Sequence, residues 1–140
     1  MMPAAPLDPA QTVIRFFRAL DDRDYATLAV LLAPDGVWHR QGTDLRSEAD
    51  ILAAMAKRSP TMRIHHLLTN VFAEPRGDGE AEVTAYMLVV RHDSGAEPAG
   101  PSPFPGIENI RTMRALLRQT PQGWRVVRLT GDAPSFATPA

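Results

Sequence analysis

Two residues far apart in the chain have the side-chain types of a proton-transfer pair. Three acids stand together in Asp21-Asp22-Arg23-Asp24, and two imidazoles stand at His65-His66 inside an apolar segment. An imidazole exchanges protons near neutral pH, and a carboxylate beside it orients the ring or shares the proton. One acid of the first group and one histidine of the second are therefore a candidate catalytic pair, provided that both face one pocket within about 3 Å of each other.

Strand alternation selects between the two histidines, because successive side chains of a strand point to opposite faces. One face of the predicted strand carries His66, Leu68, Asn70 and Phe72, and the other carries His65, Leu67, Thr69 and Val71. Only one histidine then faces a pocket, and we expect it to be His66. Asn70 on the same face can hold a substrate carbonyl or bond to a neighbouring strand.

Each of these residues also has a purely structural interpretation. Asp21 can satisfy backbone donors at a helix junction, as short acids do. His66 can be a hydrogen-bonded cavity histidine without a catalytic role. We interpret Asp22 and Asp24 as solvated or helix-capping acids and His65 as an interfacial or structural residue.

Composition excludes several classes of protein. The chain has 140 residues, 44% of them hydrophobic, a formal net charge of −1 and no cysteine. It therefore has the size of one domain, no charge excess for nucleic acid or a membrane surface, and no disulfide or thiolate chemistry. The histidines lack metal-ligand spacing, so we expect neither a metal nor another cofactor. The sequence shows no signal-peptide pattern and no apolar run of about 20 residues, which predicts a cytoplasmic protein.

Local signals predict three helices followed by long strands. Asp8-Pro9-Ala10-Gln11 has the pattern of a helix start, Asp24 caps a second helix that Pro34-Asp35-Gly36 ends, and Ser47 opens a third helix through Arg58. The predicted strands are Val37–Gln41, Met62–Ala73, Ala81–Arg91, Asn109–Thr120 and Trp124–Leu129. The proline-rich loop over residues 93–108 is either a lid or a mobile segment. This order predicts an α+β fold.

The chain divides into a flexible N-terminal arm (1–7), a single domain (8–132) and a flexible C-terminal tail (133–140). The strand at 81–91 is apolar on both of its faces, with Val83, Ala85, Met87 and Val89 on one and Tyr86, Leu88 and Val90 on the other. One face must cover the helices. The other needs a second partner, which predicts a homodimer through the outer face of the sheet.

With these elements in order, the chain resembles the SnoaL-like branch of the nuclear transport factor 2-like superfamily. The resemblance rests on the segments 20–28, 31–38, 47–55 and 63–70 and covers about residues 8–132. It implies a cone in which a strongly curved antiparallel sheet packs around three N-terminal helices and encloses a cavity, usually in a dimer. The superfamily includes dehydratases, isomerases, polyketide cyclases, epoxide hydrolases, dioxygenase small subunits and binding proteins.

The resemblance carries over residue by residue at only two positions. Asp21 matches the acid at the end of the first helix in scytalone dehydratase-like members, and His66 matches their strand histidine. That family's pair is associated with proton transfer in a dehydration, so the resemblance implies that Asp21 and His66 are the catalytic pair. Arg111 and Met113 replace the serine and asparagine of that pattern, which argues against scytalone as the substrate. Trp38 stands about where the ketosteroid isomerases have their base.

The sequence therefore predicts a cofactor-independent acid/base enzyme of the dehydratase, isomerase or cyclase type, acting on a small, apolar, oxygenated molecule. Arg111 binds an anionic group if it points inward, or pairs with Glu82 if it lies on a dimer face. The alternatives are a non-catalytic ligand-binding or dimerisation module and a structural subunit like the dioxygenase small subunits. The predicted pocket residues are Phe17, Tyr25, Trp38, Arg40, Asn70, Met87, Arg111 and Met113.

Overall fold

Residues 7–139 are described by a computed structural model of the chain, so the predicted N-terminal arm lies outside the described residues except for Leu7. The first half of the chain holds the three expected helices and two strands, and the second half holds the long strands. The elements are α1 (Pro9–Asp21), α2 (Tyr25–Leu31), β1 (Leu32–Arg40), β2 (Thr43–Leu45), α3 (Glu48–Met55), β3 (Met62–Pro75), β4 (Glu80–Asp93), β5 (Asn109–Thr120), β6 (Gly123–Gly131) and β7 (Phe136–Ala137).

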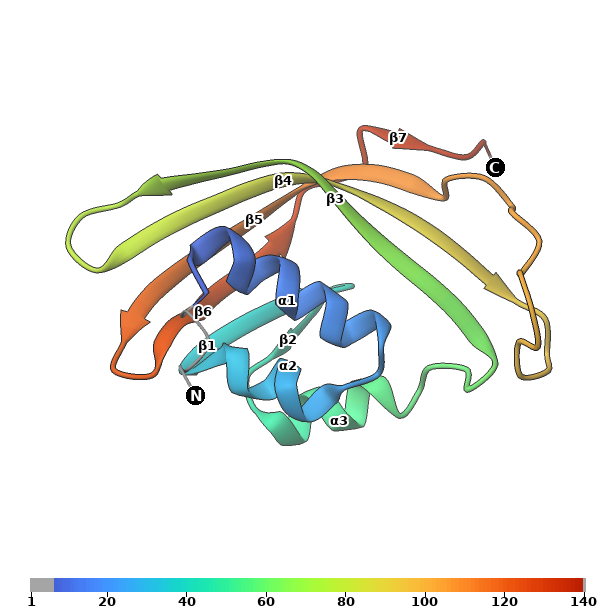
Figure 1. Cartoon of the computed structure of the whole chain (residues 1–140), viewed down its shortest axis with the longest axis horizontal. Coiled ribbons are helices and arrows are strands. Elements are labelled where there is room, and N and C mark those ends of the chain that lie inside the picture. The colour runs from blue at the N-terminus through green and yellow to red at the C-terminus, as the bar shows by residue number, and fades with distance from the viewer. Residues whose placement is uncertain (1–6, 140) are drawn as a thin grey trace, which may run out of the picture.

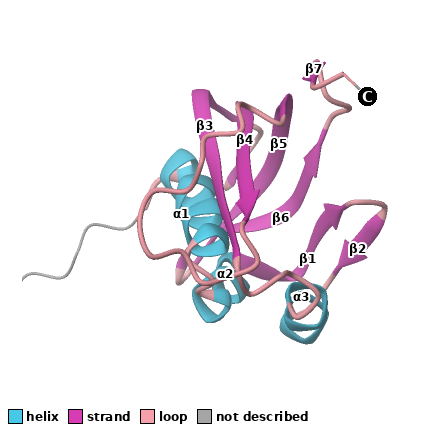
Figure 2. Cartoon of the chain, turned by 90° about the vertical axis from the view of Figure 1, so that its right-hand side faces the viewer, coloured by secondary structure: helices cyan, strands magenta, loops and turns pink. Residues whose placement is uncertain are grey.

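One curved, unclosed sheet lies over the helices and confirms the predicted α+β architecture (Figures 1 and 2). Its strand order is β2-β1-β6-β5-β4-β3, with β7 added beside β5. Neighbouring strands run antiparallel except β1 and β6, which pair in parallel. Strand β3 is therefore an edge strand, and its free side faces the layer of α1.

Helix α1 begins where the sequence predicts, because its N-terminal hydrogen bonds are satisfied by side chains. Asp8 accepts a bond from the Gln11 backbone N–H at 2.8 Å, and the Gln11 side chain accepts one from the Asp8 N–H at 3.2 Å. Val13, Phe16 and Phe17 lie on one face of this helix and are buried, at most 4% exposed. The apolar face of α1 thus fixes the helix against the sheet, with its C-terminal residue Asp21 beside β3.

Strand β3 departs from the predicted alternation at Asn70. The register with β4 shifts between Thr69 and Phe72, and Asn70 has a left-handed φ of 53°. Such a bulge inserts one residue and reverses which face the following side chains occupy. Val71 therefore packs against the core and Phe72 is 59% exposed, which corrects the expectation that Asn70 and Phe72 share the inner face of His66.

Three boundaries in the first half differ from the sequence prediction. The second helix already ends at Leu31, and β1 continues through Pro34-Asp35-Gly36, the segment that we expected to end that helix. Gly36 fits there because an added Cβ would lie 2.5 Å from the Val126 carbonyl oxygen of β6. The third helix ends at Met55 rather than Arg58, and β2, paired with β1, was not predicted.

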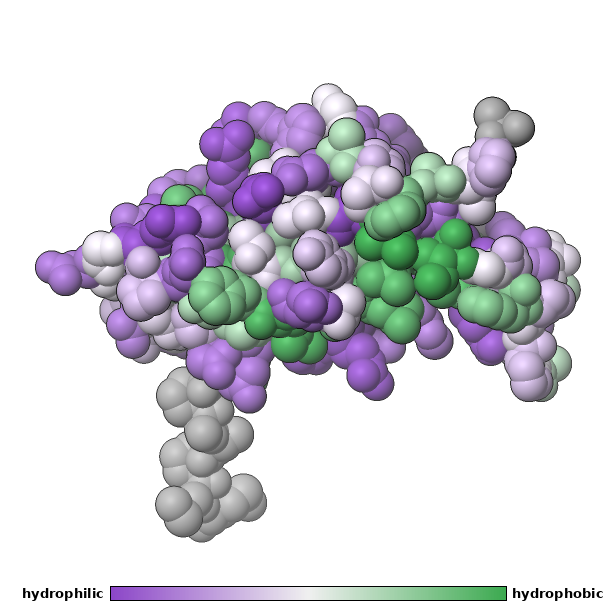
Figure 3. All heavy atoms as spheres, turned by 90° about the horizontal axis from the view of Figure 1, so that it is seen from above, coloured by the Kyte–Doolittle hydropathy of each residue, from purple (hydrophilic) through white to green (hydrophobic). Residues whose placement is uncertain are grey.

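The outer face of the sheet carries exposed apolar side chains. Leu67 is 47% exposed and Tyr86 51%, and hydrophobic atoms gather in one area when this face is viewed from above (Figure 3). The proline-rich loop lies toward this outer side, where Arg63 donates a hydrogen bond to the Gly100 carbonyl at 3.0 Å. Residues 136–137, within the expected flexible tail, form β7 and pair with Asn109 and Ile110. Among residues 7–139, no helix has the length and apolarity to cross a membrane.

Candidate active site

The carboxylate of Asp21 binds His66 through both of its oxygens. Asp21 Oδ1 lies 2.6 Å from His66 Nδ1, and Asp21 Oδ2 accepts a bond from the His66 backbone N–H at 2.8 Å. The two side chains are only 10% and 12% exposed, respectively. The structure therefore brings together the two residues that the sequence selects, within the expected distance.

The position of β3 at the sheet edge explains this contact. An edge strand leaves every second N–H without a partner in the sheet, and such a donor needs another acceptor when it is shielded from water. Asp21 supplies that acceptor at His66. Arg23 ties the same junction to the start of β3, because its guanidinium donates to the carbonyls of Ser59 (2.7 Å) and Met62 (2.9 Å). Asp21 thus has a structural role beside any chemical one, although its backbone partner is on β3 rather than at the helix junction.

The hydrogen bond to Asp21 decides which ring nitrogen of His66 is available. An ionised carboxylate only accepts hydrogen bonds, so a neutral His66 ring beside an ionised Asp21 carries its proton on Nδ1 and its lone pair on Nε2. Nε2 has no hydrogen-bond partner among residues 7–139. Every fully buried side-chain nitrogen of these residues has such a partner, so Nε2 is not fully buried. His66 lines a cavity on the inner side of the sheet.

This cavity has a volume of about 350 Å³, within the usual range for small-molecule sites. Phe17 packs at 5.5 Å from the His66 ring, centroid to centroid, and the remaining apolar wall comes from the inner faces of β1, β3, β4, β5 and β6. Of the predicted pocket residues, six line it: Phe17, Trp38, Arg40, Met87, Arg111 and Met113.

Tyr25 and Asn70 do not line this cavity, which corrects their prediction as pocket residues. The Tyr25 hydroxyl accepts a hydrogen bond from Arg58 at 3.1 Å, so Tyr25 supports a lining residue instead. Asn70 is exposed at the bulge, where its side-chain oxygen accepts a bond from the Thr69 hydroxyl. Neither position follows from helix or strand periodicity, because each depends on how two distant elements meet.

Arginines line the cavity beyond those that the sequence predicts. Arg58 and Arg91 join Arg40 and Arg111 in its wall. Arg111 points inward and donates to the Asn109 side chain at 3.3 Å, while its alternative partner Glu82 pairs with Arg76. Arg91 pairs with Glu108, which comes from the end of the proline-rich loop. No motif in the sequence marks Arg58 or Arg91, because one follows a helix and the other lies near a strand end.

The other candidate acids and histidines occupy structural positions. Asp24 caps α2 through the Thr27 N–H, and its hydrogen bonds from Thr27 lower its pKa. Asp22 is exposed and pairs with Arg18, and His65 is exposed on the outer face of β3. No cluster of three His, Asp or Glu side chains suited to a metal ion occurs among residues 7–139.

A family model identifies the class of protein to which this geometry belongs. The model of the SnoaL-like domain matches residues 10–130, so the chain belongs to the SnoaL-like family, whose members include cofactor-free isomerases, cyclases and dehydratases. No curated protein matches the chain.

Solved structures share the fold at low sequence identity. An NTF2-like protein with a cystatin-like fold from Novosphingobium aromaticivorans has a TM-score of 0.68 and 24% identity, over 87% of this chain and 77% of that one. ActVI-ORFA from Streptomyces coelicolor has a TM-score of 0.66 and 19% identity, over 86% and 92%. A protein from Catenulispora acidiphila, solved in complex with S-DNPA, has a TM-score of 0.65 and 20% identity, over 86% and 87%.

Proposed function

We propose that this SnoaL-like protein is a cofactor-independent acid/base enzyme of the dehydratase, isomerase or cyclase type. Its substrate is a small, apolar, oxygenated molecule bound in the cavity. The observation that carries the proposal is the double contact of the Asp21 carboxylate with His66, a residue of the cavity wall whose Nε2 has no hydrogen-bond partner among residues 7–139. The ligand-bound neighbour from Catenulispora acidiphila supports a small molecule as the occupant.

His66 Nε2 acts as the general base in this proposal. It removes a proton from a carbon next to a carbonyl group, and the electron pair of the C–H bond moves into the carbonyl as an enolate. Asp21 stabilises the imidazolium that forms, because the ring then carries a positive charge beside a carboxylate. Proton transfer by a positioned side chain accelerates a reaction by about 10² to 10⁴-fold.

The second half of the reaction returns the proton from His66. Delivery to another carbon isomerises the substrate, and delivery to a departing hydroxyl group releases water in a dehydration. If the enolate carbon instead attacks a second carbonyl, the new alkoxide takes the proton and a ring closes. The apolar side chains of Phe17, Trp38 and Met87 exclude water from the enolate in each case.

Exchange of α-protons tests the shared first step without knowledge of the natural substrate. 2-Tetralone is an apolar ketone with acidic α-protons, and its exchange in D₂O is followed by proton NMR. We expect the protein to accelerate this exchange and His66→Gln to lose the acceleration by about 10²-fold or more. His65→Gln is the matched control, since it makes the same change at the neighbouring residue on the outer face.

The non-catalytic alternative makes the opposite prediction in the same assay. A ligand-binding module would take up 2-tetralone, seen as saturable shifts of cavity resonances, and leave its exchange rate at the buffer value. Equal acceleration by the wild type and by His66→Gln would also contradict the assignment of His66 as the base.

We propose that the outer sheet face joins two copies of the chain back to back. The exposed side chains of Leu67 and Tyr86 support this assembly, because the free energy falls when a second copy covers an apolar sheet face. Light scattering after size exclusion is expected to give twice the chain mass for the wild type and the chain mass for Leu67→Glu. Leu52→Glu on α3, a site 46% exposed away from the sheet, is expected to remain dimeric. A monomeric wild type would contradict this assembly.

A further inference from the structure

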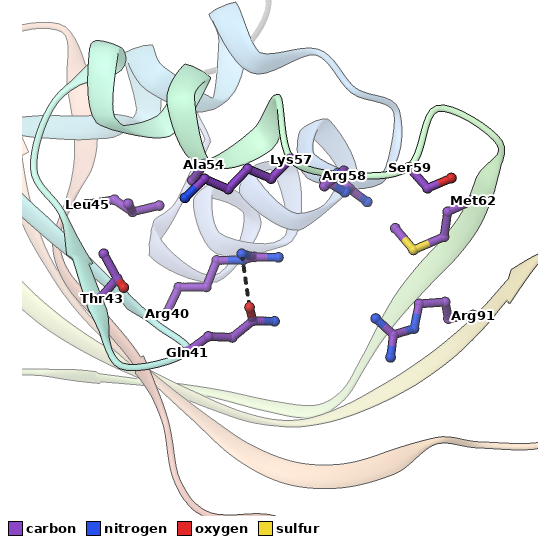
Figure 4. A pocket seen from close by; sticks show the side chains of 10 residues that line it. All are labelled: Arg40, Gln41, Thr43, Leu45, Ala54, Lys57, Arg58, Ser59, Met62 and Arg91. Carbon is purple, nitrogen blue, oxygen red and sulfur yellow. Dashed lines mark hydrogen bonds between the residues drawn. The ribbon is translucent and has the colours of Figure 1, made fainter.

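The cavity beside His66 adjoins a second hollow of about 340 Å³ that is rich in positive charge. The two spaces share Arg40, Gln41, Arg58, Met62 and Arg91 in their walls and therefore lie side by side. Lys57 adds a fourth cation to the second hollow, and neither Asp nor Glu is among its lining residues. Figure 4 shows the side chains of Arg40 from β1, Arg58 from the segment after α3 and Arg91 from β4 around this hollow.

Two of these arginines have no carboxylate partner among residues 7–139. Arg40 donates a hydrogen bond to the Gln41 side-chain oxygen at 3.5 Å, and its guanidinium lies 5.7 Å from the centroid of the Trp38 ring. Arg58 donates to the Leu20 carbonyl at 2.9 Å and to the Tyr25 hydroxyl. Arg91 does pair, with Glu108. The hollow therefore carries a surplus of positive charge in a partly buried place.

This surplus is unfavourable in the absence of an anion. Burial lowers the pKa of Arg40, and the charges of Arg58 and Arg91 lower it further, while Tyr25 acts in the opposite direction. Partly buried like charges repel each other because less water screens them. Such an arrangement lowers the stability of the folded protein, and groups perturbed in this way are enriched at functional sites.

We propose that Arg40, Arg58 and Arg91 form a subsite for an anionic oxygen group, a carboxylate or a phosphate, carried by the substrate. A guanidinium offers a planar pair of donors that matches both groups. The apolar body of the same molecule then lies between Trp38 and Met87, with its reacting carbon beside His66. This placement rests on the proposed function, whereas the anion subsite itself rests on the arginines.

Binding of matched probes tests the subsite directly. The probes are 2-naphthoate, 2-naphthyl phosphate and neutral methyl 2-naphthoate, measured by isothermal titration calorimetry. We expect the anions to bind at least about tenfold more tightly than the ester, the range expected of hydrogen bonds to a charged group. The tighter of the two anions identifies the group that the subsite prefers. Their advantage over the ester should shrink in high salt, because salt screens exposed charge.

Variants assign the effect to the cluster. Arg40→Gln is expected to weaken the preferred anion about tenfold and to leave the ester within about twofold. Arg128→Gln makes the same change in net charge at an exposed site on β6 and should change neither probe. If circular dichroism shows that Arg40→Gln does not fold, Arg91→Gln carries the same test, because the Arg91 side chain is 44% exposed.

Three results would overturn the subsite: equal affinities for anions and ester, equal losses in Arg40→Gln and Arg128→Gln, or no binding of either anion. The fate of the proposed function is read separately. His66→Gln should keep the affinity for the preferred anion within about twofold while it loses α-proton exchange. Anion binding without exchange in the wild type would retain the subsite and reject the enzyme. α-Proton exchange without a preference for the anions would retain the enzyme and reject the subsite.

Discussion

Two histidine–aspartate pairs in this molecule share one geometry and differ in their surroundings. His66 Nδ1 lies 2.6 Å from Asp21 Oδ1, and His39 Nδ1 lies 2.6 Å from Asp44 Oδ1. The side chains of the first pair are 12% and 10% exposed, and those of the second are 48% and 43% exposed. His39 also lines the cavity of His66. Neither the distance between the groups nor contact with the cavity therefore distinguishes the buried candidate pair from the more exposed outer pair.

The difference lies in what each carboxylate does with its second oxygen. Asp21 Oδ2 holds the His66 backbone N–H, so the imidazole and its strand are fixed as one unit. Asp44 Oδ2 accepts a hydrogen bond from the exposed Arg46 guanidinium, which competes with His39 for the negative charge of the Asp44 carboxylate. His39 and Asp44 are also direct cross-strand partners in a local hairpin, whereas α1 must pack on β3 to join Asp21 to His66. Burial and a second fixed contact make the inner pair suitable for proton transfer.

The largest expected difference between the two pairs is in turnover. Asp21→Asn keeps the size of the side chain but removes the negative charge that stabilises the imidazolium. We therefore expect the rate of α-proton exchange of 2-tetralone to fall about 10²-fold. Asp44→Asn removes the same charge from the outer pair and should leave the rate within about twofold. Similar losses in both variants would remove the distinction between the pairs.

Stability is expected to separate the pairs next. Asp21→Ala leaves the shielded His66 N–H without an acceptor, which costs about 1–3 kcal/mol in the free energy of unfolding. Asp44→Ala should give no change beyond measurement error, because water replaces the lost contacts at an exposed site. Urea unfolding followed by circular dichroism measures both. An unchanged midpoint for Asp21→Ala would show that water already satisfies the edge of β3.

Local sequence signals predict the parts of this fold that neighbouring residues determine. Asp8 and Gln11 cap α1 as expected, and the alternation of Val83, Ala85, Met87 and Val89 gives the inner face of β4. These features depend on residues within one turn or one strand. The Asp21–His66 contact was also expected, but from the family resemblance, since no local signal joins a helix end to a strand 45 residues away.

The features that the sequence did not predict depend on the meeting of distant elements. The bulge at Asn70 is defined by the register of β3 against β4, and it moves Asn70 out of the pocket. Arg58 reaches the cavity because the segment after α3 passes beside α1, where it donates to the Leu20 carbonyl. Tyr25 was predicted as a pocket residue, yet its hydroxyl accepts a hydrogen bond from that same arginine. Periodicity gives the face on which a side chain lies and not its neighbours, so Arg58 and Arg91 were missed although Arg40 was predicted.

The smallest expected effect concerns the acid titration of the outer pair. The hydrogen bond from His39 is the main cause that lowers the pKa of Asp44 from its ordinary value of 3.8, with further lowering from the charges of His39 and Arg46. The charged form is thus favoured in the folded state, so any stabilisation is present above pH 3.8 and is lost as the pH falls through the lowered pKa. His39→Gln should raise the pKa of Asp44 toward 3.8, as followed by carbon-13 NMR of its carboxyl group. If His39→Gln leaves the pKa of Asp44 unchanged, the lowered pKa is due to Arg46. The contact between His39 and Asp44 would then have no electrostatic effect.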